Sequence, residues 1–589
     1  MEPEPNFEEL PDEIWELILN RLGDDHHSQF DSISLVSKRL LSLTDCLRLH
    51  FTVVDQSYIT HGTIYPLISR FVNLKTLDLS KLKYINLEAA ISEIARSSVA
   101  MNLQVIDISN QISLPIESLK ELGQSNRKIK VLRCAYVGKL RDQDLITIAK
   151  FYPDLEELDI SYPLHKLAIA VVGSCDLGKT MITDAGIEHL SSGLKNLIKI
   201  NVSMNPLLTD KSLVSLSSNC LRLQEILFEK SVMITMEGVL FMLHNSPSLR
   251  SISACLIANI YKTDSIVMNP ATSCRHLSNL CLKDSSISNE LLNSIVEARF
   301  PLKSVCLSSC SYSLDGLSNF LSAYPSIRFL DLSNNKFFRD GFIISLSQCL
   351  HDLVSVKLNF CTKLTRASLL ALFNKCLFLE NVEMEHTNLG KNENSILIRA
   401  NHPRTNLSIK SLNLGLNSHL SDECLLKINS ACPKLKRLDV NSCIGITWSI
   451  GEILKICPEV EHLSIQNCGG VMNIGLKMEP LRLKKLYMAR SGVNDQGLGV
   501  IAARCNELVK IDLEGCRFVT ISAVKFMVKK CEKLREINLM GCPNLHVFIV
   551  EWLVHTRPSL RKLIPPSYAV TTENQRQLML RRGCKVCAK

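Results

Sequence analysis

Long apolar runs, aromatic residues and a strong excess of either charge are all missing from this sequence. Phe, Trp and Tyr make up 6% of the 589 residues, and no stretch approaches the roughly 18 consecutive apolar residues that a membrane-spanning helix needs. The first 13 residues (MEPEPNFEELPDE) are acidic, whereas a secretory signal starts with basic residues and runs into an apolar segment. We therefore expect a nuclear or cytoplasmic protein with no membrane partner.

Motifs of catalysis are missing as well. The sequence has no glycine motif for phosphate or dinucleotide binding at a strand-to-helix turn, and no zinc-spaced set of Cys and His residues. Cys584 and Cys587 form a lone C-x-x-C pair, and the ending VCAK does not fit a prenylation signal. The net charge of +9 is mild for this length and gives no case for nucleic-acid binding. We expect no catalytic residue, no metal and no nucleic-acid partner, and hence a protein that is not an enzyme.

Cysteine, by contrast, is frequent, with 23 residues. Without a secretory signal, reduced thiols are expected rather than disulfides. The apolar content of 46% and charged content of 21% are ordinary for a folded chain. Because 589 residues exceed what one ordinary core needs, several domains or a long repeat array are expected.

A repeat accounts for most of the chain. The pattern L-x-x-L-x-L recurs about 18 times, mostly every 25 or 26 residues, within the range of roughly 20–29 residues for leucine-rich repeats. Its first position is held by Leu74, Leu103, Ile129, Leu155, Leu197, Leu223, Leu249, Leu277, Leu302, Ile327, Leu353, Leu379, Ile409, Leu435, Val460, Leu483, Leu508 and Leu534. A degenerate copy follows at Leu560.

Cysteines occupy two further positions of the repeat. Eight residues after the first position lie Cys310, Cys361, Cys443, Cys468, Cys516 and Cys542, or else Asn205, Asn335 and Asn417; three residues before it lie Cys220, Cys274, Cys376, Cys432, Cys457, Cys505 and Cys531. A buried Asn or Cys in the first column can bond backbone groups that a turn leaves unpaired. Cys in the second column is a small buried residue where a helix ends. These 13 cysteines are interpreted as scaffold, although counting alone leaves open a cysteine nucleophile of the ligase type.

Each copy also predicts a helix after its turn. Clear starts are Thr183-Asp184, Thr209-Asp210, Ser421-Asp422 and Asn494-Asp495. The first residue of each pair is an N-cap, and the Asp places negative charge at the helix start. Stacked units of strand, turn and helix predict a curved solenoid with an inner parallel sheet and outer helices.

The first 46 residues do not fit the repeat. In LPDEIWELILNRL, Pro11 suits the first turn of a helix, and Ile14, Leu17, Ile18 and Leu22 form an apolar face. A second helical segment, DSISLVSKRLLSL, begins at Asp31. Two helices this short bury little core alone, so they must dock on the repeats, on a partner, or on both.

This segment resembles an F-box. The matching positions are Leu10-Pro11, Ile14, Ile18, Leu22, Leu35-Val36 and Lys38-Arg39, whereas Ser37 and Leu40 stand where Cys and Trp are common. Followed by cysteine-containing repeats, it is similar to the plant F-box/leucine-rich-repeat proteins over nearly the whole chain. The resemblance implies an α/β fold, with a small all-α F-box module (1–46), a connecting strand and helix (47–73), a leucine-rich-repeat horseshoe (74–565) and a C-terminal cap or tail (566–589).

The resemblance also implies a function. In that family the F-box binds a Skp-type adaptor, which connects to a cullin scaffold, and the repeats capture a protein for ubiquitination and proteasomal degradation. The adaptor-binding set would be Leu10, Pro11, Ile14, Leu17, Ile18, Leu22, Leu35, Val36 and Lys38. Leu17 and Leu22 fit equally well in the core of the module. Two alternatives are a leucine-rich scaffold with no ligase role and a hormone or small-molecule receptor within the ligase framework.

The x positions of the repeat project from the sheet and offer substrate contacts. Late copies place Lys410, Lys436, Arg437, Lys484, Lys485, Lys510 and Arg535 there, whereas Glu156, Glu157, Asp159, Glu380, Glu383 and Glu385 belong to two other copies. The basic run could hold an acidic or phosphorylated segment, or an inositol phosphate as related plant receptors do. Otherwise no cofactor is expected, and a solvated charged face is the competing interpretation.

Three copies are longer than the rest. Their insertions lie between Ile160 and Thr183, from about Ile257 to Ser273, and from about His386 to Ser408. Such insertions form loops at one edge of a solenoid, either as a binding edge or as plain surface additions.

Overall fold

The computed structural model describes residues 10–21, 30–31, 33–60, 62–163, 181–255, 275–391, 404–472, 480–546, 548–566 and 573–587. The chain divides into two compact units. The first unit is Met1–Ser286 with Ser294–Pro301, and the second is Ile287–Asn293 with Leu302–Lys589. Most of each predicted insertion, Leu22 and the predicted repeat cysteine Cys274 lie outside the described residues.

The first unit opens with helices α1 (Asp12–Asn20) and α3 (Lys38–Leu47). Their shared core consists of Leu19, Phe30 and Leu43, surrounded by Trp15, Ile33, Leu40 and Leu47. Arg39 joins the two helices through an ion pair with Asp12 at 2.7 Å. Ser37 caps α3, because its hydroxyl oxygen accepts a hydrogen bond from the backbone N–H of Leu40 at 3.2 Å. The two departures from the F-box pattern, Ser37 and Leu40, therefore serve the helix cap and the core.

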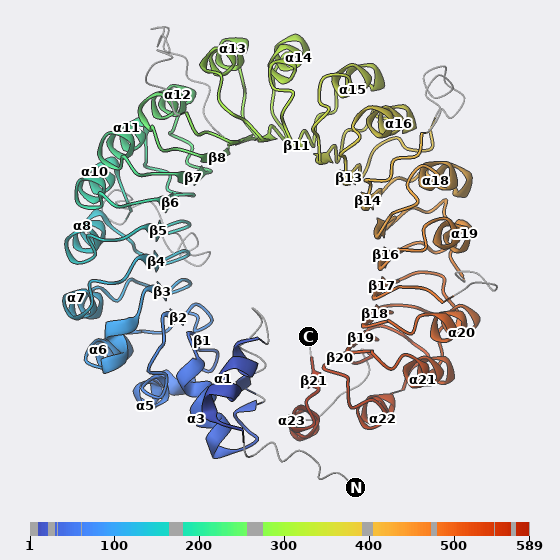
Figure 1. Ribbon diagram of the computed structural model, residues 1–589, viewed down its shortest axis with the longest axis horizontal. Helices are drawn as coiled ribbons and strands as arrows, with labels where there is room; N and C mark the ends of the chain where they lie inside the picture. Colours follow the sequence, from blue (N-terminus) through green and yellow to red (C-terminus); the bar gives the residue numbers. More distant parts are fainter. Residues whose placement is uncertain are drawn as a thin grey trace, which may run out of the picture. The chain divides into compact units, whose positions relative to one another are not determined.

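A ladder of parallel strands follows in the first unit, each strand pairing with the next in sequence. The strands are β1 (His50–Thr52), β2 (Thr76–Asp78), β3 (Val105–Asp107), β4 (Val131–Arg133), β5 (Glu157–Asp159), β6 (Lys199–Asn201), β7 (Glu225–Glu229), β8 (Ser251–Cys255) and β9 (Asn279–Lys283). The helices between them are α4 (Ser57–Thr60), α5 (Ile64–Ile68), α6 (Glu88–Ala95), the 3-10 helix Ser98–Asn102, α7 (Ile116–Ser125), α8 (Asp142–Phe151), α10 (Asp184–Gly193), α11 (Asp210–Asn219) and α12 (Met236–Asn245). Figure 1 shows the strands along one side of this unit and the helices along the other.

The second unit repeats the same arrangement (Figure 1). Its parallel strands are β10 (Ser304–Cys306), β11 (Phe329–Asp331), β12 (Ser355–Lys357), β13 (Asn381–Glu383), β14 (Ser411–Asn413), β15 (Arg437–Asp439), β16 (His462–Ser464), β17 (Lys485–Tyr487), β18 (Lys510–Asp512), β19 (Glu536–Asn538), β20 (Lys562–Ile564) and β21 (Lys585–Val586). Its helices are α14 (Leu314–Ala323), α15 (Asp340–Ser347), α16 (Arg366–Lys375), α18 (Asp422–Asn429), α19 (Ser449–Ile456), α20 (Asp495–Arg504), α21 (Ile521–Lys530), α22 (Phe548–Thr556) and α23 (Glu573–Arg581). Helix α13 (Asn289–Ala298) spans the point where the chain passes between the units.

The repeat positions form the cores of both units. All 18 predicted first positions are at most 2% exposed, and each precedes one of the strands β2 to β19. The degenerate copy at Leu560 is also buried and precedes β20. The prediction of an α/β repeat solenoid is therefore confirmed.

The Asn and Cys column closes the turns as predicted. Asn417 donates to the backbone carbonyls of Met384 and Leu414 at 2.8 and 2.9 Å. The Cys443 thiol donates to the carbonyl of Leu414 at 3.2 Å. Each side chain thus reaches a carbonyl of the preceding repeat, which satisfies backbone groups inside the core.

The Asp at the helix start does more than the sequence predicted. The carboxylate of Asp184 accepts hydrogen bonds from the backbone N–H and the hydroxyl of Thr209, at 2.9 and 2.6 Å. The same Asp–Thr bridge joins Asp142 to Thr183, Asp210 to Thr235, Asp340 to Thr365, Asp422 to Thr447 and Asp495 to Thr520. Gly238 makes room for one bridge, because a Cβ there would lie 2.2 Å from the Oδ1 of Asp210. Each bridge fastens one outer helix to the next.

Candidate functional site

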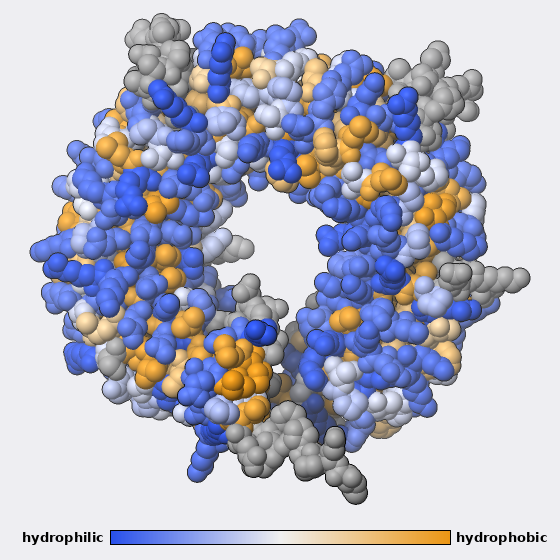
Figure 2. All heavy atoms as spheres, viewed as in Figure 1, coloured by the Kyte–Doolittle hydropathy of each residue, from blue (hydrophilic) through white to orange (hydrophobic). Residues whose placement is uncertain are grey.

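Helices α1 and α3 leave an apolar patch uncovered. Ile14, Leu17, Ile18, Leu35 and Val36 are 40%, 59%, 41%, 87% and 72% exposed, and we call them the module patch. An orange patch appears in Figure 2 where Figure 1 places these helices. Leu17 is therefore a surface residue, and the core of the module is made by other side chains. Exposed apolar side chains that gather on one surface are a common feature of protein-binding surfaces.

The other predicted adaptor-binding residues border this patch in sequence. Pro11 and Lys38 are exposed and Leu10 is half-buried, while Leu22 lies outside the described residues. The carbonyl of Leu10 accepts a hydrogen bond from the Arg39 guanidinium. That contact holds the start of α1 against the start of α3, so the patch has a defined backbone.

A buried arginine joins the helical module to the first strand. The side chain of Arg48 is 6% exposed and pairs with Asp31 at 2.9 Å. Its guanidinium also lies 6.0, 5.7 and 5.2 Å from the ring centres of Phe30, Phe51 and Phe71. Phe30 belongs to the module, whereas Phe51 is in β1 and Phe71 follows α5. Cation–π contacts from both sides thus fix the module on the repeats within the first unit.

Replacing Arg48 by alanine is expected to weaken this joint by about 2–3 kcal/mol, because a desolvated cation–π contact contributes about 2 kcal/mol and the stem of the side chain packs as well. Hydrogen exchange of α1 and α3 in the intact chain measures the effect. Arg70→Ala is the control, because Arg70 is 43% exposed and its 2.8 Å pair with Asp45 is worth at most about 1 kcal/mol. Equal exchange in both variants would contradict the assigned role.

The predicted basic run lies on the strands of the second unit, and part of it is already neutralised. Lys410 pairs with Glu380 at 2.6 Å, Lys484 with Glu461 at 3.0 Å, and Lys510 with Glu536 at 2.9 Å. Positively and negatively charged side chains are therefore less separated than the sequence indicated, because side chains from neighbouring repeats form ion pairs. Exposed pairs of this kind contribute little to stability.

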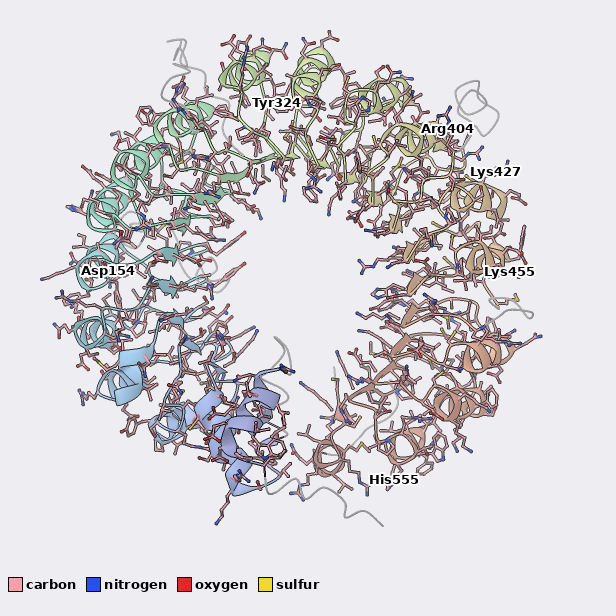
Figure 3. All side chains as sticks on the ribbon, viewed as in Figure 1. Asp154, Tyr324, Arg404, Lys427, Lys455 and His555 are labelled. Atoms are coloured by element: carbon pink, nitrogen blue, oxygen red, sulfur yellow. The ribbon has the colours of Figure 1, made fainter. Side chains whose placement is uncertain are left out.

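Four of the seven predicted basic residues keep their charge available. Within the described ranges, Lys436, Arg437, Lys485 and Arg535 have no ion-pair partner. Arg437 and Lys485 begin strands β15 and β17, with His462 in register between them. Figure 2 shows this strand side of the second unit as hydrophilic. Lys427 and Lys455, by contrast, lie on α18 and α19, away from the strands (Figure 3).

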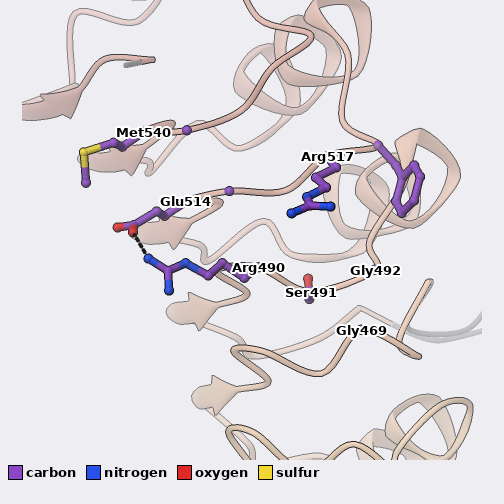
Figure 4. A pocket seen from close by; sticks show the side chains of 10 residues that line it. Gly469, Arg490, Ser491, Gly492, Glu514, Arg517 and Met540 are labelled. Carbon is purple, nitrogen blue, oxygen red and sulfur yellow. Dashed lines mark hydrogen bonds and ion pairs between the residues drawn. The ribbon is translucent and has the colours of Figure 1, made fainter. Parts of the chain in front are cut away.

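A hollow lies at the turns that follow strands β16 to β19 (Figure 4). It has a volume of 630 Å³ and is lined by Gly469, Arg490, Ser491, Gly492, Glu514, Gly515, Arg517, Phe518, Met540 and Gly541. Arg490 and Glu514 form an ion pair across it at 3.1 Å. Gly515 has a φ of +67°, and a Cβ there would lie 2.9 Å from the Cγ of Arg490. The sequence did not predict this hollow, although its glycines recur at fixed places in successive repeats: Gly469 and Gly492 lie nine residues after the first repeat position, and Gly515 and Gly541 lie seven residues after it.

The buried cysteines are poor nucleophiles. Of the 21 in the described part of the chain, 16 are buried and Cys46 is exposed. Burial raises the pKa of Cys376 and Cys457 to about 12, and burial also raises the pKa of Cys220 to about 11. Because the thiolate is the reactive form, such thiols do not react at neutral pH.

Native alkylation followed by mass spectrometry tests this property. Cys46 is expected to react with iodoacetamide within minutes at pH 7.5, whereas the 16 buried thiols should react about 100-fold more slowly, since they require local opening. All of them should react at similar rates in denaturant. A buried thiol that reacts as fast as Cys46 in the native chain would point to a functional nucleophile.

Two other kinds of site were searched for in the described residues. None of their helices has the length and apolar character to cross a membrane. The same residues contain no group of three or more His, Cys, Asp or Glu side chains arranged to hold a metal ion.

The fold and its surfaces together define a class: an α/β repeat solenoid, preceded by a small helical module with an exposed apolar patch. No family model matches the chain. The chain is similar to a curated Arabidopsis thaliana protein, BTB/POZ domain-containing protein FBL11, with 20% identity over 482 residues, which cover 79% of this chain and 47% of that protein. The chain thus spans about half the length of this relative.

Two solved structures are similar at lower sequence identity. A chain from the yeast Rad7 and Elc1 complex has 15% identity and a TM-score of 0.36, over 76% of this chain and 93% of its own length. An internalin (inlF) of Listeria monocytogenes has 15% identity and a TM-score of 0.31, over 77% of this chain and 94% of its own length.

Proposed function

We propose that this chain is the non-catalytic substrate-recognition subunit of a Skp-cullin-F-box type ubiquitin ligase. The module patch would bind a Skp-type adaptor, and the repeats would bind the protein to be ubiquitinated. The observation that carries the proposal is the outward placement of Ile14, Leu17, Ile18, Leu35 and Val36 on a module whose core is complete without them. Apolar side chains in these positions favour a permanent protein partner.

The joint at Arg48 supports the same function. A receptor subunit has to hold its bound protein at a defined position, and a flexible linker would allow a wide range of positions. Here the module is fastened to β1 and to the segment after α5 by the buried cation–π contacts of Arg48. This connection suits a helical module that is held rigidly on the repeats better than two domains that move independently.

The strand surfaces support the second half of the proposal. Parallel strands two to five residues long present alternate side chains to the same face, and repeat proteins use such continuous surfaces to bind other proteins. In the second unit this surface combines unpaired cations, hydroxyl groups and carboxylates. It therefore suits a polar or charged protein segment.

Co-expression with a Skp-type adaptor tests the proposal. We expect the full chain and the adaptor to purify together as a stable complex, with one adaptor per chain by light scattering. A folded chain that shows no association with the adaptor under native conditions would overturn the ligase assignment and favour a scaffold role. Substrate capture that persists after exhaustive dialysis would exclude a requirement for a small-molecule ligand.

A further inference from the structure

The hollow at the turns after β16 to β19, which we call the turn hollow, has bare backbone along its wall. Gly469, Gly492, Gly515 and Gly541 all line it. A Cβ on Gly492 would lie 2.1 Å from the carbonyl oxygen of Gly469, so two successive turns approach each other closely there. A Cβ on Gly469 itself would meet nothing within 4 Å. Glycines of this kind let the main chain of a ligand come close, and the volume of 630 Å³ is within the range of about 300–1,000 Å³ for ligand sites.

One positive charge beside the turn hollow has no partner. Arg490 and Glu514 neutralise each other at 3.1 Å. Arg517 forms no ion pair with any residue that the structure describes, and its side chain reaches into the hollow beside that pair (Figure 4). Two arginines and one glutamate are the only charged residues among the described ones that line the hollow, so one net positive charge remains. This charge suits a ligand with a single negative charge, because the Glu514 carboxylate would repel a dianion.

Apolar side chains lie next to this charge. Phe518 is 59% exposed and Met540 is half-buried, and both line the turn hollow. An exposed aromatic ring and a flexible thioether can adapt to an apolar side chain of a ligand. Ligand sites typically combine such apolar walls with a few polar groups that fix the orientation. The turn hollow therefore suits a carboxylate that is joined to an apolar group.

We propose that the turn hollow binds the C-terminal end of a protein chain. The Arg517 guanidinium donates to the terminal carboxylate, and the Glu514 carboxylate accepts from the backbone N–H of the last residue. Phe518 and Met540 contact the apolar side chain of that residue. This inference rests on the proposed function and names the class of its substrate, a protein that is recognised by its C-terminus.

A chain end matches these groups better than an acidic side chain does. In the last residue of a chain, the carboxylate, the backbone nitrogen and the side chain are all attached to one Cα atom. A cation, an anion and an apolar wall of the same hollow can therefore bind them together. In Asp or Glu the carboxylate is itself the side chain, so the apolar contact would have to come from another residue. Guanidinium groups bind carboxylates through two parallel hydrogen bonds, and capture of a terminal carboxylate is an established mode of peptide recognition.

Binding of two peptide libraries to the full chain tests the proposal. Both contain the same short degenerate sequences with a fluorescent label at the N-terminus, but one library ends in a free carboxylate and the other in an amide. We expect the free-acid library to bind at least about tenfold more tightly, because an amide cannot form the charge-assisted bond with Arg517. R517Q should lose at least about tenfold of the affinity for the free-acid library. Equal binding of the two libraries by the original chain would overturn the proposal.

Gly469 allows a steric test that leaves the charges unchanged. G469F should weaken binding of the free-acid library at least about tenfold, because its side chain has room at the hollow and would occupy it. Its unfolding temperature should stay within about 2 °C of the original, since no neighbouring atom has to move. G341F is the matched control, because a Cβ on Gly341 also meets nothing within 4 Å, in helix α15 away from the hollow.

A second control separates Arg517 from general charge. Arg482 is exposed and has no ion-pair partner in the described ranges, and it does not line the hollow. R482Q and G341F should each stay within about twofold of the original affinity, at the same ionic strength. Equal losses in R517Q and R482Q, or in G469F and G341F, would contradict the assignment.

Competition with N-acetylphenylalanine distinguishes a chain end from a small free acid. Weak competition, at concentrations far above those of the peptides, supports a chain end. Competition at equal concentrations would assign the hollow to small carboxylic acids and overturn the assignment to a protein. Adaptor binding by R517Q and G469F should be unchanged. A chain that binds the adaptor but not the free-acid library contradicts this inference alone, whereas one that binds the library but no adaptor supports it and contradicts the proposed function.

Discussion

Changing Ile14 and Ile18 to aspartate is expected to weaken adaptor binding at least about 100-fold. Burial of each isoleucine side chain against a partner is worth about 1.5–3 kcal/mol, and every 1.4 kcal/mol is a factor of ten in affinity. Aspartate in their place would also bring two unpaired charges into an apolar interface. The affinity is measured by titrating purified adaptor into the full chain.

Because the two side chains are exposed, this test separates a loss of adaptor binding from a loss of folding. Ile14 and Ile18 are 40% and 41% exposed and lie outside the core of Leu19, Phe30 and Leu43, so the module should remain folded. V54D/V72D is the matched control, since Val54 and Val72 are 72% and 50% exposed and lie after β1 and α5. Equal loss of affinity in the control variant would show that charge, and not the module patch, is responsible.

The second large effect is expected at Asp422. Replacing it by asparagine should lower the free energy of unfolding by about 2–3 kcal/mol, because buried hydrogen-bond donors lose a charged acceptor. Asp422 is 5% exposed. Its carboxylate accepts bonds from the N–H and hydroxyl of Thr447, at 3.0 and 2.6 Å, and from the N–H of Ser449 at 3.0 Å. The asparagine amide would point N–H groups at some of these donors. Hydrogen exchange of α18 and α19, together with thermal unfolding, measures the loss.

The pH dependence of this effect has a definite sign. Burial alone would raise the pKa of Asp422, but hydrogen bonds from Ser449 and Thr447 hold it below its usual value. A carboxyl with a lowered pKa in the folded chain stabilises above the unfolded pKa of about 3.9, and this contribution is lost as the pH falls through the folded value. The difference between Asp422→Asn and the original chain should therefore be full at pH 7 and shrink below about pH 4.

Asp512 provides the opposite case as a control. Burial raises the pKa of Asp512, so its ionised form opposes folding at neutral pH and the cost is relieved as the pH falls. Asp512→Asn should leave stability at pH 7 unchanged or slightly higher, because an amide oxygen can still accept from the N–H of Glu514. A loss at Asp512 equal to that at Asp422 would contradict both assignments.

Features that depend on spacing along the chain were predictable. The period of Leu435, Val460 and Leu483 predicted strands at β15, β16 and β17, because a buried first position at a constant interval forces neighbouring copies to stack. The column of Cys443 and Cys468 was predicted as buried scaffold, and both thiols are 0% exposed. Local chemistry also predicted the N-cap at Ser421, whose hydroxyl accepts from the N–H of Cys424 at 3.3 Å.

Features that depend on a partner in the next repeat were not predictable from the local pattern. Asp184 was expected to act only on its own helix, yet its carboxylate bonds Thr209 in the following repeat. Lys410 was expected to be available for a substrate, but Glu380 neutralises it from the preceding strand. Arg48 had no assigned role, because the three aromatic rings around it come from three separate segments.

The Asp–Thr bridges have a mechanical consequence. Each bridge connects one helix only to its neighbour. In the first unit the bridges from Asp142 to Thr183, from Asp184 to Thr209 and from Asp210 to Thr235 follow one another, so they act as links in series. Under tension each link bears the same load, and the first repeat to yield is the one with the fewest bonds to its neighbours. Helices α18 and α19, which the Asp422 carboxylate joins with an additional bond from the N–H of Ser449, should separate later than helix pairs with fewer bonds. When the chain is pulled from its ends, we expect it to lengthen in steps of about one repeat each, before a whole unit unfolds.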